Sequence, residues 1–227
     1  MKIKKIILTT LSFLIMSFTQ ENQKKINSDK ELKYLALGDS YTIGESIEEK
    51  DRWTYHLVDL LRKEGKKISY PDIIAKTGWT TDELIKAIKI SNTNKYDLVS
   101  LAIGVNNQYR GRKVEEYKIE LDKLLEISIL FANKNPDHVF MISIPDWGVT
   151  PFASKSNSKK IAEEINKFNE VAREECKKYK INFIDITPIS RKAFNNPEMI
   201  TSDQLHFSGK MYKLWAEEIF KSIKTIF

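Results

Sequence analysis

The sequence predicts a three-layer α/β/α sandwich around a mainly parallel five-stranded sheet. Short apolar runs alternate with longer amphipathic runs along the chain, which is the element order of α/β folds. Most of the apolar runs lack a two-residue alternation, as expected of strands that are covered on both faces. Polar motifs follow several of these runs, at positions that a parallel sheet would bring to one edge.

Five runs are predicted to be strands because they are short, apolar and rich in β-branched residues. They cover residues 34–37, 73–75, 98–103, 139–144 and 181–186.

Five segments with helical periodicity lie between and after these runs. Residues 52–64 form the first, and the second begins at Thr80 or Thr81 with an acidic first turn. The third covers residues 117–132, and the fourth carries Cys176 on its apolar stripe. The last segment follows Ser208, which we expect to cap it.

The first nineteen residues are interpreted as a signal peptide. Lys2, Lys4 and Lys5 precede an apolar stretch over residues 6–18, which is short for a membrane span and is followed by polar residues. The alternative is an uncleaved anchor, because residues 17–19 make a poor cleavage site. We therefore expect an exported protein, periplasmic or extracellular, with a single domain over residues 24–227.

Charge and cysteine content exclude several classes of protein. Removal of the three N-terminal lysines lowers the formal net charge from +6 to +3, and no basic stripe suggests nucleic-acid binding. Cys176 is the only cysteine, so we expect a buried structural thiol. The three histidines are scattered, and no phosphate loop or dinucleotide motif occurs, so we expect no metal and no cofactor.

Two motifs far apart in the chain supply the parts of a nucleophilic site. Ser40 directly follows the apolar run 34–37 in the motif Gly38-Asp39-Ser40. Asp203 and His206 lie three residues apart, so the Asp203 carboxylate can accept the Nδ1 proton of the imidazole. A serine hydroxyl needs an adjacent base that is itself oriented by a third group, and these residues provide all three.

Four sequence blocks together resemble the GDSL, or SGNH, hydrolase family. The resemblance covers nearly all of the chain after the N-terminal segment and implies a flavodoxin-like architecture. The blocks are Gly38-Asp39-Ser40-Tyr41, Gly78, Gly104-Val105-Asn106-Asn107 and Asp203-Gln204-Leu205-His206.

The resemblance implies a serine esterase. Ser40 would be the nucleophile, His206 the general base and Asp203 its orienting carboxylate. The backbone amides of Ser40 and Gly78 and the side-chain amide of Asn106 would stabilise the oxyanion. Asp39 is expected to be structural and to bind nearby loop amides.

The sequence departs from the family's blocks at two positions. Tyr41 replaces a leucine, which should affect packing only. Asn107 replaces the aspartate that usually follows the family's asparagine, so the order of this loop is in question while the amide donor of Asn106 is kept.

The sequence leaves simpler interpretations and the substrate open. Ser40 or Asp203 could be a helix cap, and Gly78 and Asn106 could be turn residues. The substrate is expected to be a small-molecule ester, with a lysophospholipase-like lipid ester slightly preferred over an acetylated carbohydrate. A non-catalytic carbohydrate- or lipid-binding protein is the alternative of a different class.

Trp53 and Trp215 are expected in the core, and Trp79 and Trp147 at the edge of the site.

Overall fold

The computed structural model describes residues 31–91 and 95–226. The predicted signal peptide therefore lies outside the described residues. In the described part, five parallel strands pair in the order β2-β1-β3-β4-β5. The strands are β1 (Tyr34–Gly38), β2 (Asp72–Ala75), β3 (Leu98–Ala102), β4 (Val139–Ile142) and β5 (Asn182–Ile184).

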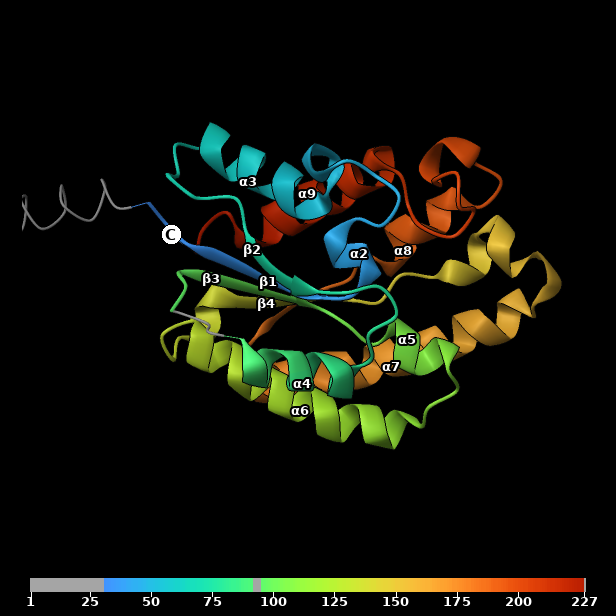
Figure 1. Ribbon diagram of the computed structural model, residues 1–227, viewed down its shortest axis with the longest axis horizontal. Helices are drawn as coiled ribbons and strands as arrows, with labels where there is room; N and C mark the ends of the chain where they lie inside the picture. The colour runs from blue at the N-terminus through green and yellow to red at the C-terminus, as the bar shows by residue number, and fades with distance from the viewer. Residues whose placement is uncertain (1–30, 92–94, 227) are drawn as a thin grey trace, which may run out of the picture.

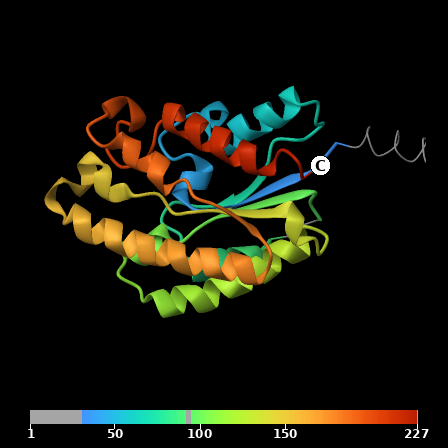
Figure 2. The same ribbon diagram turned by 180° about the vertical axis from the view of Figure 1, so that it is seen from behind.

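Helices cover both faces of this sheet (Figure 1). On one face, α3 (Trp53–Lys63) packs against α9 (Gly209–Ile223). On the other face lie α4 (Thr81–Ile90), α6 (Val114–Phe131) and α7 (Ser158–Lys178). The view from behind shows the same three layers (Figure 2). The predicted fold class and the five long helices are confirmed.

The core lies on both sides of the three central strands. Every residue of β1, β3 and β4 is buried, which explains why these runs lack a two-residue alternation. Trp53 of α3 and Trp215 of α9 are fully buried, as the sequence predicts. Cys176 of α7 is buried beside Met141, so the prediction of a buried thiol is also confirmed.

Short helices that the sequence analysis did not predict follow the strands at their carboxyl ends. They are α2 (Ser40–Ile43), α5 (Val105–Tyr109) and α8 (Thr187–Ser190), with 3₁₀ turns at Trp147–Val149 and Pro151–Lys155. Figure 1 places α2, α5 and α8 together at one edge of the sheet. No helix in the described ranges has both the length and the apolarity needed to cross a membrane.

Several expected element ends differ from the structure: β3 ends at Ala102 and not at residue 103, and β5 covers Asn182–Ile184 and not residues 181–186. Strand β4 stops at Ile142: the Ser143 amide still donates to the Ile184 carbonyl of β5 at 2.9 Å, but the Ile144 amide leaves the sheet and donates to Asn169 Oδ1 at 2.8 Å. Ser208 occupies the N-cap position of α9 as expected, but its hydroxyl donates to the Glu198 carbonyl at 2.6 Å and makes no capping hydrogen bond to the helix.

Candidate active site

Four of the five residues predicted for the site line one small cavity at the carboxyl edge of the sheet. The cavity has a volume of about 140 Å³, and Ser40, Gly78, Asn106 and His206 all contribute to its wall. Asp203 is not part of the lining and contacts His206 from behind. We call this space the Ser40 cavity. Its remaining lining residues are Tyr41, Thr77, Val105, Tyr109, Trp147, Phe152 and Leu205.

The tight turn from β1 into α2 fixes the position of Ser40. Asp39 is the N-cap of α2, and its Oδ1 accepts a hydrogen bond from the Tyr41 amide at 3.0 Å. Ser40 is therefore the first residue of a helix and not its cap. A Cβ atom at Gly38 would lie 2.6 Å from the Ala102 carbonyl oxygen of β3, so only glycine allows this close approach of the two strands.

The carboxyl group of Asp39 is buried directly behind the serine. Burial raises the pKa of Asp39 to about 7, although the hydrogen bond from the Tyr41 amide opposes that shift. This carboxyl binds a backbone amide, as the sequence analysis expects of a structural residue.

Asp203 holds the imidazole of His206 through a single hydrogen bond within one turn. Asp203 Oδ2 lies 2.7 Å from His206 Nδ1, and the same oxygen accepts from Ser46 Oγ at 2.6 Å. The other oxygen, Oδ1, accepts from Thr201 Oγ1 at 2.6 Å and from the amides of Leu205 and His206 at 2.9 Å each. Asp203 thus caps its own turn and not the final helix.

These donors keep Asp203 ionised. Burial alone would raise the pKa of Asp203, but the hydrogen bonds from Ser46, Thr201 and the two amides outweigh it and hold the pKa well below its usual range. A negative carboxylate therefore faces the ring nitrogen at neutral pH.

Ser46 is a site residue that the sequence analysis missed. It follows Gly44, the left-handed C-cap of α2, and has itself a left-handed backbone with φ +66°. Non-glycine residues rarely adopt this conformation, and here it accompanies a hydroxyl that reaches Asp203. The Gly44-Glu45-Ser46 sequence signals only a turn, because the partner lies 157 residues further along the chain.

Gly78 faces the cavity from the loop after β2, and Asn106 faces it from the first turn of α5, which follows β3. Gly78 has φ +82°, and its carbonyl accepts from Arg110 Nη2 at 2.5 Å. Asn106 Nδ2 donates to the Trp79 carbonyl at 3.0 Å. Because an amide nitrogen carries two hydrogens, the second N–H of Asn106 remains available.

Asn107 is firmly held where the sequence left the order of the loop in question. Its side chain is fully buried; Oδ1 accepts from the Thr81 amide at 3.1 Å, and Nδ2 donates to Thr81 Oγ1 at 2.7 Å. Thr81 Oγ1 in turn donates to Glu120. The side-chain amide of Asn107 thus joins α5 to the start of α4. The family's usual aspartate at position 107 would bring a carboxylate to this loop; here Glu120 provides one.

Three aromatic side chains form the outer wall of the Ser40 cavity. The Trp147 ring lies edge-on to Tyr109 at 5.2 Å and to Phe152 at 6.1 Å between ring centroids. Trp147 Nε1 donates to Gln108 Oε1 at 2.7 Å, which fixes the indole. Of the two tryptophans expected at the site edge, Trp147 lines the cavity, whereas Trp79 packs against the core and offers only its carbonyl.

The remaining histidines lie outside this cavity. His56 is in α3, where burial lowers its pKa, and His138 ends the 3₁₀ turn Pro136–His138 just before β4. Across the two described ranges, no group of three or more His, Cys, Asp or Glu side chains is arranged to hold a metal ion.

The chain matches one family model over most of its length. That model is the GDSL-like Lipase/Acylhydrolase family, and the match covers residues 36–214. The chain therefore belongs to this family, as its four sequence blocks suggest. No curated protein sequence gave a significant match.

Solved structures with the same fold include several ester hydrolases. The structure of TesA is 16% identical with a TM-score of 0.67, and the match covers 86% of this chain and 99% of that one. A variant of Axe2, an acetyl xylan esterase from Geobacillus stearothermophilus, is 16% identical with a TM-score of 0.68, covering 85% and 94%. A lipase/acylhydrolase from Enterococcus faecalis is 22% identical with a TM-score of 0.61, covering 85% and 95%. At these identities the likeness establishes the fold.

The Thr81 contacts predict the effect of Asn107→Asp, which would introduce the family's usual residue. Thr81 Oγ1 already donates its one hydrogen to Glu120, so the new carboxylate would face an acceptor without a proton between them. We expect a loss of about 1–3 kcal/mol in the free energy of unfolding, measured by denaturant titration. The double variant Asn107→Asp/Glu120→Gln should recover most of it. A single variant as stable as the native protein would contradict this role of Asn107.

Proposed function

We propose that this protein is an exported serine esterase that hydrolyses carboxylic esters, with Ser40, His206 and Asp203 as its catalytic triad. The observation that carries the proposal is the hydrogen bond of 2.7 Å between Asp203 and His206, on an imidazole that lines the same cavity as Ser40. Membership of a lipase/acylhydrolase family supports the same reaction class. The proposed export rests on the N-terminal sequence alone.

In this mechanism Ser40 Oγ attacks the ester carbonyl while His206 Nε2 accepts the hydroxyl proton. The imidazolium then protonates the leaving alcohol, which departs and leaves an acyl group on Ser40. A water molecule loses a proton to His206 and attacks the acyl-enzyme, and the carboxylic acid leaves as Ser40 regains its proton. Asp203 stays ionised throughout and stabilises the imidazolium.

The oxyanion formed in both steps would be stabilised by three donors. These are the backbone amides of Ser40 and Gly78 and the free N–H of the Asn106 side chain. All three residues line the Ser40 cavity, and the bond to the Trp79 carbonyl orients the Asn106 amide before substrate binds. Donors that are already oriented stabilise charge without a reorganisation cost.

Ser46 and Thr201 would act as positioning residues through Asp203. Each holds one carboxylate oxygen at 2.6 Å, so the carboxylate cannot rotate away from His206. A fixed carboxylate fixes the imidazole ring and its tautomer, which the proton transfer requires.

The shape of the Ser40 cavity favours a short acyl group. Its volume of about 140 Å³ is small, and Tyr109, Trp147 and Phe152 line its wall. The slight preference for a lysophospholipase-like lipid ester, which we inferred from the sequence, remains a prediction. A series of p-nitrophenyl esters from acetate to palmitate tests it directly, and the volume leads us to expect the highest kcat/KM at the short end.

The assignment of the nucleophile is tested with Ser40→Ala. Because no other group would form the acyl-enzyme, we expect ester hydrolysis to fall to background while the thermal unfolding curve is unchanged. A fluorophosphonate probe should label the native protein at Ser40 and leave Ser40→Ala unlabelled. Full activity in the variant, or labelling at another serine, would overturn the proposal and favour a non-catalytic binding protein.

The oxyanion role predicts the kinetics of Asn106→Ala. The donor acts on charge that exists only in the transition state, so kcat should fall by roughly 10²–10³ with little change in KM. Steady-state kinetics on p-nitrophenyl acetate measures both constants. A raised KM at unchanged kcat would instead mean that Asn106 binds the ground-state ester.

The role of Ser46 is tested with Ser46→Gly. Glycine adopts the left-handed backbone of residue 46 without strain, so this variant removes the hydroxyl and leaves the turn intact. We expect kcat to fall about tenfold at nearly constant KM and Tm, because Asp203 loses a hydrogen bond to a charged group. Unchanged kcat would show that Ser46 serves only the turn.

A further inference from the structure

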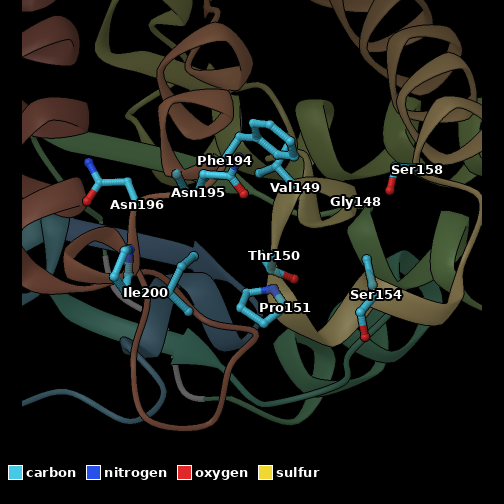
Figure 3. Close-up of a pocket in the computed structure, with 13 residues that line it drawn as sticks. Gly148, Val149, Thr150, Pro151, Ser154, Ser158, Phe194, Asn195, Asn196 and Ile200 are labelled. Carbon is cyan, nitrogen blue, oxygen red and sulfur yellow. The ribbon is translucent and has the colours of Figure 1, made fainter.

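A second and larger cavity lies next to the Ser40 cavity. Its volume is about 470 Å³, and its walls are formed by residues of the segments 148–158 and 193–200 (Figure 3). The two cavities share a wall, since Trp147 and Phe152 line the smaller one while the residues between them line the larger. We call the larger space the Phe194 cavity.

Small residues and a fixed backbone create this space. Gly148, Ala153 and Ala193 are buried parts of its lining, and none has a side chain large enough to fill it. The Phe152 amide donates to the Gln204 carbonyl at 3.0 Å, which ties the shared wall to the loop that carries His206. The cavity is thus built into the same loop framework as the site.

The chemistry of the lining is neutral. None of its thirteen residues is charged, although charged residues make up 30% of the chain. Its polar groups include the hydroxyls of Ser154 and Ser158 and the amides of Asn195 and Asn196. Within the described part of the chain, none of these four side chains hydrogen-bonds another residue, so all four can bind a ligand.

Phe194 adds a flat apolar surface to these polar groups. Its side chain is 65% exposed, which is unusual for a phenylalanine, and Figure 3 shows its ring above Val149 with the Asn195 amide beside it. An exposed aromatic ring can cover the C–H face of a sugar ring while neighbouring amides and hydroxyls bind its hydroxyl groups.

We propose that the Phe194 cavity binds the alcohol part of the ester and that this part is a neutral polyhydroxylated group, such as a sugar unit. The inference rests on the proposed function, because the ester bond must reach Ser40 across the shared wall. The acyl group occupies the small aromatic cavity, and the leaving alcohol occupies the larger one. A phosphate or ammonium headgroup would lose water in the Phe194 cavity without meeting an opposite charge.

The experiment compares three esters on the native protein and on Phe194→Ala. Two share the acetyl group: p-nitrophenyl acetate, with a small leaving group, and an acetylated xylotriose, with a neutral sugar. The third is lysophosphatidylcholine, whose headgroup is charged. We expect the ratio of kcat/KM for the acetylated xylotriose over p-nitrophenyl acetate to fall about tenfold in the variant, since one aromatic contact is lost. The matched control is Ile119→Ala on α6, 61% exposed and in neither cavity lining, which should leave this ratio unchanged.

The outcomes separate the two proposals. If the native protein hydrolyses none of the three esters, the proposed function fails. If it hydrolyses p-nitrophenyl acetate but the ratio does not fall in Phe194→Ala, the esterase stands and the sugar subsite is refuted. A preference for lysophosphatidylcholine that depends on Phe194 would also refute it, because the cavity would then accept a lipid headgroup.

Discussion

The arrangement of the site depends on the tight turn from β1 into α2. Gly38 brings the backbone of β1 so close to β3 that a Cβ atom would lie 2.6 Å from the Ala102 carbonyl oxygen. Asp39 then caps α2 from a buried position, and Ser40 becomes the first helical residue. The other elements of the site are arranged around this fixed serine, since α5 and the loops after β2, β4 and β5 all meet it at one cavity.

The fold and the main site residues could be predicted because their signals are local. Each strand is a short apolar run, and four polar blocks follow the runs in the order that a parallel sheet brings to one edge. Ser40, Gly78, Asn106 and His206 accordingly line one cavity. The roles assigned to these four residues remain proposals.

The contacts that could not be predicted join residues far apart in the chain. Ser46 reaches Asp203 only because the turn after α2 lies against the turn before α9. From the sequence, Asn107 put the order of its loop in question. In the structure its side chain hydrogen-bonds Thr81, which in turn donates to Glu120. The Phe194 cavity likewise depends on the packing of two irregular segments, which have no periodicity that a sequence pattern could reveal.

The serine segment and the Asp203–His206 segment lie far apart in the chain, so they are synthesised at different times. Ser46 and Asp203 are 157 residues apart, which corresponds to roughly 10–30 s of synthesis at ordinary rates. During that interval the growing chain holds the serine segment but no base beside it. Contacts of such long sequence separation also close late in folding, because a large loop must be ordered first. A chain that has not yet received residues beyond 200 therefore holds the proposed nucleophile but neither the base nor the carboxylate of the proposed triad.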